Sequence, residues 1–223
     1  MRGISNLRPA LPKYNITWDP KLLLVYLKGL FPTESLSLKF LNLKLATLLA
    51  LITGHRLQTI SLIRPSNIKV SSTGYQVLIT DKLKTSSSSS TPSSLHIPLF
   101  SEEPALCVAS LLKRYLVVTS SFRSQQADFL FLTHQRPHRE ATKQTISRWV
   151  KLTMELAGLD TSKFKPHSTR HASTSTALKR GVPLATILKT AGWSRESNTF
   201  RNFYNLPITD DMDFAVSILQ AAR

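Results

Sequence analysis

The sequence predicts a mainly helical protein with one small three-stranded antiparallel sheet. Three observations support this fold class. Apolar residues recur at helical spacing through most of the chain, and they alternate at a spacing of two only between residues 67 and 99. Hydrophobic residues make up 42% of the 223 residues, which is enough for a substantial core in one large domain or two small ones.

Helices are predicted in the front part of the chain from their capping and breaking residues. Thr17 is a candidate N-cap for a helix over 18–30, which Pro20 opens. A second helix over 35–53 ends where Gly54 breaks the pattern, and a short helix carrying Arg56 follows. The helices predicted further along cover 105–118, 142–157, 167–180 and 183–191, followed by a short helix or turn at 197–204 and a final amphipathic helix at 210–222.

The alternating region predicts three strands, at 67–70, 75–80 and 95–99. The turn 71–74 joins the first two, and Pro98 marks either an edge strand or the end of its strand. A serine-rich loop at 86–90 precedes the third strand. Such a loop is either a solvated connection or a segment that orders over a bound polyanion.

The charge balance points to a negatively charged partner. Lys and Arg number 29 against 13 acidic residues, a formal charge of +16 that is spread along the chain. This excess predicts attraction to nucleic acid, and a generically basic ribosomal or membrane-surface protein is the alternative. The single cysteine, Cys107, excludes an internal disulfide and sits in an apolar run typical of a core. No Cys/His cluster has zinc-binding spacing.

Targeting signals are missing from the sequence. No stretch reaches the roughly 18 uninterrupted apolar residues of a membrane helix, and the first six residues lack an apolar signal core. We therefore expect an intracellular protein that does not associate with a membrane. Residues 1–16 are predicted to form a linker or arm, and residues 17–223 a single functional domain.

One group of polar and aromatic residues suits chemistry on a phosphodiester. His167 and Arg170 stand three apart, so they share one face of the helix that Pro166 opens. The start of a helix attracts anions, so an acid/base candidate and a fixed cation point at one spot. Further along the chain follow Trp193 and Tyr204.

These residues carry a resemblance. Thr-Gly-His-Arg56, a hairpin Lys-Thr, His167-x-x-Arg170, Gly-Trp193 and Tyr204 follow one another in the order found in tyrosine recombinases of the phage-integrase type. The resemblance covers residues 18–223 and implies the catalytic-core fold that this family shares with type IB topoisomerases. The segments 17–20 and 36–39 look most like recombinases of eukaryotic DIRS-type, Ngaro-type or Crypton-type mobile elements.

The resemblance assigns a role to each residue. Arg56 and Arg170 would bind the non-bridging phosphate oxygens, and Trp193 would donate one hydrogen bond to them. His167 would donate to the phosphate and act as a general base for Tyr204, the nucleophile that forms a 3′-phosphotyrosine. The other tyrosines lie before this helix and are disfavoured as nucleophiles; they are Tyr14, Tyr26, Tyr75 and Tyr115.

Further candidates come from the hairpin and from the residues beside the catalytic set. Lys84 would protonate the leaving 5′-oxygen, with Lys82 as its rival. Lys82, His171 and Arg195 are the candidate DNA-binding residues, and His171 is expected to pack beneath the site. The resemblance implies neither a metal nor ATP, because the arginines supply the positive charge and the phosphotyrosine keeps the bond energy.

The partner would be double-stranded DNA, bound by a homodimer or homotetramer, with the nucleus as the location in a eukaryote. Two departures leave alternatives open. Thr59 stands where the family often has an acidic residue, and about 17 linker-like residues precede the predicted domain in place of a DNA-clamping helical domain. A domesticated, inactive DNA-binding module and a relaxing enzyme similar to type IB topoisomerases therefore remain alternatives. The final helix could pack in cis or against a neighbouring protomer.

Overall fold

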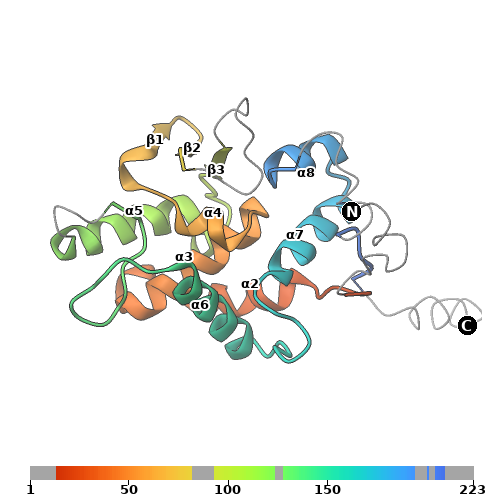
Figure 1. The fold of residues 1–223 in the computed structure, drawn as a ribbon, viewed down its shortest axis with the longest axis horizontal. Helices are drawn as coiled ribbons and strands as arrows, with labels where there is room; N and C mark the ends of the chain where they lie inside the picture. The colour runs from red at the N-terminus through yellow and green to blue at the C-terminus, as the bar shows by residue number, and fades with distance from the viewer. Residues whose placement is uncertain (1–13, 82–92, 124–127, 194–199, 201–203, 209–223) are drawn as a thin grey trace, which may run out of the picture.

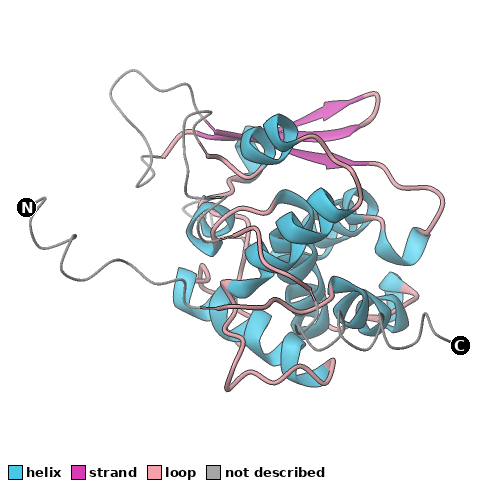
Figure 2. Cartoon of the chain, turned by 90° about the vertical axis from the view of Figure 1, so that its right-hand side faces the viewer, coloured by secondary structure: helices cyan, strands magenta, loops and turns pink. Residues whose placement is uncertain are grey.

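The fold is mainly helical, and a three-stranded antiparallel sheet lies along one side of the helical body (Figures 1 and 2). The computed structural model describes residues 14–81, 93–123, 128–193, 200 and 204–208. Its α-helices are α2 (Pro20–Gly29), α3 (Leu38–Thr53), α4 (Leu57–Ser61), α5 (Val108–Thr119), α6 (Lys143–Leu156), α7 (Ser168–Lys179) and α8 (Leu184–Thr190). The predicted fold class is confirmed.

Helix α2 begins at Pro20, two residues later than predicted. Asp19 caps it, because its carboxylate accepts a hydrogen bond of 2.8 Å from the amide of Lys21, while Pro20 occupies the first helical position. The prediction of Thr17 as the cap was wrong. The amide of Thr17 instead donates to the carbonyl of Pro207, which ties the segment before α2 to the segment after Tyr204.

Helix α3 is the central element of the core. It is buried along most of its length and packs against α5, α6 and α7. The predicted start at Ser35 was too early, because residues 33–35 form a separate 3₁₀ turn and α3 starts after Ser37. The predicted end at Gly54 is confirmed, since this glycine adopts the left-handed conformation with φ of 59°.

The sheet has the order β1–β2–β3 with antiparallel pairing throughout, and its strands are β1 (Ile68–Ser71), β2 (Gly74–Ile79) and β3 (Ser93–Pro98). Alternate residues of β2 and β3 are fully buried, and β3 packs against α3 and α5. Pro98 ends the edge strand β3, as predicted. A Cβ at Gly74 would lie 2.1 Å from the carbonyl oxygen of Ile97, so only glycine fits this turn.

A buried polar network fixes the segment that follows α5. The hydroxyl of Tyr115 donates to Oδ1 of Asn42 at 2.8 Å and accepts from the amide of Leu132 at 3.0 Å. The side-chain amide of Asn42 donates in turn to the carbonyl of Leu132. The buried residues 130–132 are therefore held to α3 and α5 by hydrogen bonds as well as by packing. Cys107 is buried in the same core, as expected.

The last described helices, α7 and α8, surround a second, smaller hydrophobic cluster. Its buried members include Ile187, Leu188, Trp193 and Phe200, with Tyr204 packed against them. Of the predicted turn at 197–204 only Phe200 and Tyr204 are described, and the predicted helix at 210–222 lies outside the described residues, as do most of the arm and the serine-rich loop. None of the described helices is long and apolar enough to cross a membrane.

Candidate active site

Arg56 lies at a sharp turn between α3 and α4. The left-handed Gly54 ends α3, and two residues later Arg56 becomes the N-cap of α4, with its side chain exposed. Thr59, three residues on, is buried in α4, and as a threonine it offers Arg56 no carboxylate. No acidic residue in the described part of the chain pairs with Arg56.

The start of α7 places His167 and Arg170 close together. His167 is the N-cap of α7 and its side chain is exposed, whereas Arg170 is only 3% exposed. The indole of Trp18 donates a hydrogen bond of 2.8 Å to the hydroxyl of Ser168, which anchors the beginning of the helix to the chain before α2. The predicted shared face therefore has a solvent-facing imidazole and a buried guanidinium one turn apart.

Arg170 is a buried cation held by uncharged partners. Its Nη1 donates to the carbonyls of Gly54 and Ala191, both at 2.7 Å, and its guanidinium carbon lies 3.5 Å from the ring centre of Trp193. Its Nε and Nη2, and the indole nitrogen of Trp193, have no hydrogen-bond partner among the described residues. These three N–H groups are the unused donors of the site.

The electrostatic surroundings of Arg170 are positive. Burial, followed by the nearby charge of Arg56, lowers its pKa to about 9, and the Tyr204 phenol opposes this shift. The guanidinium still carries its charge at neutral pH. Because two cations approach each other with no neutralising carboxylate within the described chain, the site attracts an anion that can bind several hydrogen-bond donors.

Tyr204 packs directly against this cluster. Its ring stacks on His171 with 4.0 Å between ring centres and meets the ring of Trp193 edge-on at 4.8 Å. The guanidinium carbon of Arg170 lies 5.4 Å from the Tyr204 ring. The hydroxyl of Ser175 on α7 donates to the carbonyl of Tyr204 at 2.7 Å, which holds its backbone in place.

His55 and Gly192 form the wall behind the arginine. Gly192 has φ of 70°, and a Cβ there would lie 2.7 Å from Cε1 of the buried His55. Burial and the charge of Arg170 lower the pKa of His55 to about 4, while a hydrogen bond with the backbone of Thr190 opposes the shift. His55 is therefore a neutral packing residue. This role was missed, because nothing in the local sequence pairs His55 with Gly192.

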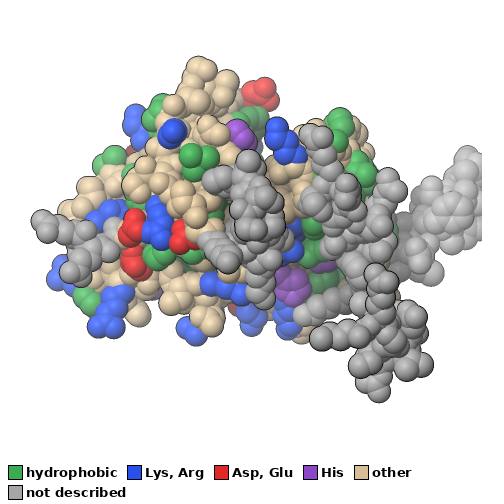
Figure 3. Space-filling model, turned by 45° about the horizontal axis from the view of Figure 1, so that its top comes forward, with side chains coloured by type: hydrophobic (Ala, Val, Ile, Leu, Met, Phe, Trp, Pro, Cys, Tyr) green, Lys and Arg blue, Asp and Glu red, His purple; other side chains and the backbone are tan. Residues whose placement is uncertain are grey.

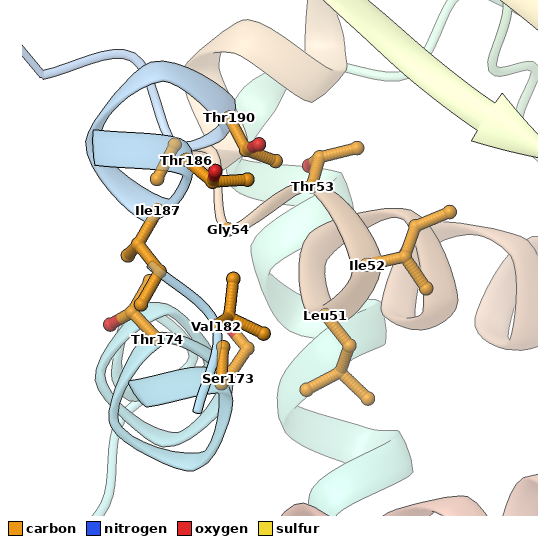
Figure 4. A pocket seen from close by; sticks show the side chains of 12 residues that line it. Leu51, Ile52, Thr53, Gly54, Ser173, Thr174, Val182, Thr186, Ile187 and Thr190 are labelled. Atoms are coloured by element: carbon orange, nitrogen blue, oxygen red, sulfur yellow. The ribbon is translucent and has the colours of Figure 1, made fainter. Parts of the chain in front are cut away.

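A small cavity lies behind the turn at Gly54. It has a volume of about 110 Å³ and is enclosed by the end of α3 together with α7 and α8 (Figure 4). Its walls are apolar groups and hydroxyls, and they include both residues whose carbonyls bind Arg170, Gly54 and Ala191. No group of three or more metal-ligating side chains occurs among the described residues.

Tyr14 is a second residue of the site that the sequence did not predict. It belongs to the segment predicted as an arm, yet it is 8% exposed, and its hydroxyl lies 3.1 Å from Nε2 of His167. Its ring also packs edge-on against His171 at 5.3 Å. The signal in the sequence is a single aromatic residue in a proline-containing stretch.

The structure thus brings together the predicted residues of the C-terminal half. They are His167, Arg170, His171, Trp193 and Tyr204, with Arg56 near enough to affect the pKa of Arg170. Lys82, Lys84 and Arg195 lie outside the described residues, so their roles stay predictions. Lys and Arg side chains spread over the face shown in Figure 3 rather than gathering in one patch.

Comparisons with known proteins show the family and the fold of the chain. The model of the phage integrase family matches residues 32–207. No curated protein sequence matches the chain. Among solved structures, the fold is similar to the XerH site-specific recombinase bound to its difH substrate, with a TM-score of 0.66, 18% identity and coverage of 94% of this chain and 53% of XerH.

Two further structures show the same fold. XerA recombinase has a TM-score of 0.63 and 18% identity, over 97% of this chain and 67% of XerA. A lambda integrase dimer bound to a COC′ core site has a TM-score of 0.59 and 14% identity, over 92% of this chain and 53% of the integrase. The chain spans about half the length of XerH and lambda integrase.

Proposed function

The chain belongs to the phage integrase family, and from this premise we propose that it breaks and rejoins DNA strands through a covalent bond to Tyr204. The observation that carries the proposal is the environment of Arg170. A buried cation with two unused N–H donors lies against the ring of a tyrosine whose backbone is fixed. A DNA phosphodiester has the negative charge and the acceptor oxygens that this environment lacks.

Each cationic or polar side chain has one task in this reaction. Arg56 and Arg170 donate to the non-bridging oxygens, where negative charge builds up in the transition state. The indole nitrogen of Trp193 donates a further hydrogen bond to the phosphate. Because Arg170 is already held by two carbonyls, its guanidinium does not need to be ordered when the substrate binds.

The bond changes balance without an external energy source. The Tyr204 oxygen attacks phosphorus after losing its proton to a base, for which His167 is the candidate. The phosphorus–5′-oxygen bond breaks, and Lys84 supplies the proton to the leaving oxygen. A 3′-phosphotyrosine and a free 5′-hydroxyl result. Religation reverses these steps, so the phosphodiester energy is conserved.

The proposed partner is double-stranded DNA, bound by two or four copies of the chain. XerH and lambda integrase, which share the fold, were solved on DNA, the latter as a dimer and as a tetramer on a Holliday junction. The integrase of the Tn1549 transposon is a further similar structure. We propose a mobile element as the source, of the DIRS, Ngaro or Crypton type suggested by the sequence, with action in the nucleus of a eukaryotic host.

A covalent-adduct assay tests this function. Because the target site is unknown, the substrate is a pool of nicked suicide duplexes with a randomised centre, and products are resolved under denaturing conditions. The intact protein should form an adduct, Tyr204→Phe should form none, and Tyr75→Phe should behave as the intact protein does. The absence of an adduct with the intact protein, or its persistence in Tyr204→Phe, would refute the proposal.

A second candidate function is an inactive DNA-binding module, and the buried Thr59 favours it. Without a carboxylate at that position, Arg56 lacks the support that related recombinases often have. Such a module would bind duplex DNA with a steep salt dependence and form no adduct. Relaxation of supercoiled plasmid by a monomer would instead favour a topoisomerase-like enzyme.

A further inference from the structure

One face of α7 holds the segment that carries Tyr204. His171 and Ser175 stand four residues apart in this helix, so they lie on the same face, and both are buried. The imidazole of His171 stacks on the ring of Tyr204, while the hydroxyl of Ser175 binds the backbone beside this ring. The helix that supplies Arg170 thus also contacts both the side chain and the backbone of the candidate nucleophile.

Ser175 makes two hydrogen bonds to this segment. Its hydroxyl donates to the carbonyl of Tyr204 at 2.7 Å and accepts from the amide of Leu206 at 3.2 Å. A serine hydroxyl has one hydrogen to give and two lone pairs to receive, so a single oxygen can join these two backbone groups. Because Ser175 is only 4% exposed, water competes little for either hydrogen bond.

Neighbouring hydroxyls of α7 behave differently. Serine and threonine within a helix commonly donate back to a carbonyl one turn earlier in the same helix. The hydroxyls of Ser173 and Thr174 both donate to the carbonyl of Arg170 in this way. Ser175 instead gives its hydrogen to Tyr204, which lies 29 positions further along the chain. Its hydroxyl therefore joins two separate segments of the chain.

Backbone hydrogen bonds hold the chain on both sides of the same tyrosine. The amide of Tyr204 donates to the carbonyl of the buried Phe200 at 2.9 Å. Beyond the tyrosine, the carbonyl of Pro207 accepts from the amide of Thr17 at 2.8 Å. The hydroxyl of Ser175 is a side-chain partner of this segment, so a substitution can remove it while every backbone group stays in place.

We propose that Ser175 is a positioning residue for the nucleophile. This inference deepens the proposed function and rests on it for its meaning in catalysis. The two hydrogen bonds hold the backbone at 204–206, so that the phenol ring lies against Arg170 and Trp193 before DNA binds. Without the hydroxyl the segment loses this anchor, and the phenol occupies the attacking position for less of the time. Ser175 acts through the backbone and takes no part in the bond changes.

The first test reads the position of Tyr204 without DNA. The protein is labelled with fluorotyrosine, and the ¹⁹F signal that Tyr204→Phe removes is assigned to Tyr204. Ring currents from His171 and Trp193 should separate this signal from its position in the unfolded protein. Ser175→Ala should move it toward the unfolded position and leave the other tyrosine signals in place. The control Ser173→Ala, which loses a hydroxyl that bonds within α7, should move none of them.

The second test reads the reaction. At saturating DNA, Ser175→Ala should slow adduct formation by roughly 10- to 100-fold, because a misplacement of a reacting group by about 1 Å can cost that much. DNA affinity should stay unchanged, and Ser173→Ala should react at the rate of the intact protein.

Three outcomes would overturn the inference. They are an unchanged Tyr204 signal or rate in Ser175→Ala, an equal loss of rate in Ser173→Ala, and a shift of all tyrosine signals to their unfolded positions in Ser175→Ala. A shift confined to the Tyr204 signal, with no adduct from the intact protein, would confirm that Ser175 holds Tyr204 and refute only the recombinase function.

Discussion

Replacing Arg170 with methionine should abolish adduct formation and yet change the stability of the free protein little. Methionine fills much of the same volume without the charge. Three energies at this buried side chain determine the change in the free energy of unfolding. They are the cost of burying its charge, the hydrogen bonds to Gly54 and Ala191, and the contact with Trp193.

The favourable and unfavourable contributions of Arg170 to the free energy of unfolding nearly cancel. The fall of the Arg170 pKa from its ordinary value to about 9 corresponds to about 5 kcal/mol of unfavourable burial and repulsion from Arg56, which the variant regains. Against this, two buried carbonyls lose their donors at about 2 kcal/mol each, and the desolvated contact with Trp193 loses about 2 kcal/mol. The expected net loss is about 1 kcal/mol. A buried arginine paired with a carboxylate would instead cost about 3–5 kcal/mol on removal.

Urea unfolding at pH 7, followed by circular dichroism, measures this difference. The sign of the pH dependence gives a second check. Unfolded arginine keeps its proton throughout this pH range, whereas folded Arg170 releases it near pH 9, so raising the pH stabilises the folded form. From pH 8 to 10 the wild type should gain about 1.4 kcal/mol over Arg170→Met. A loss above about 3 kcal/mol at pH 7, or no relative gain at high pH, would contradict the view of Arg170 as an uncompensated cation.

Three further substitutions test the packing at the site and in the core. Gly192→Ala should lower the free energy of unfolding by at least about 2 kcal/mol and reduce adduct formation, because the added Cβ meets His55. The control Gly181→Ala, which has a similar φ but open space around it, should lose only about 1 kcal/mol in the same unfolding assay. Tyr115→Phe should cost about 2–4 kcal/mol, because it leaves two buried partners unpaired. Lys44→Met should be about 1 kcal/mol more stable than the wild type at pH 7, because burial lowers the Lys44 pKa to about 8. This gap should close at about pH 9 and reverse by about pH 10, because folded Lys44 releases its proton before unfolded lysine does.

Local sequence signals predicted the elements but not all of their ends. The spacing of apolar residues identified every described helix, because the side that faces the core repeats along the chain. The residues that cap the helices were less well determined by the sequence. Thr17 and Asp19 both have side chains suited to capping, but Asp19 is the cap of α2, while the amide of Thr17 pairs with the carbonyl of Pro207.

The sequence by itself determined which residue types the candidate site contains. Arginines suit the anionic oxygens of a phosphodiester, and Arg170, Trp193 and Tyr204 follow one another in an order that can be recognised without a structure. Only the tertiary structure decided how these side chains are held. The carbonyls that fix Arg170 come from Gly54 and Ala191, 116 and 21 residues away along the chain. Tyr14 meets His167 across 153 residues. Contacts of this kind leave no periodic or local pattern, since they depend on where α7 and the segment before α2 meet in the packed core.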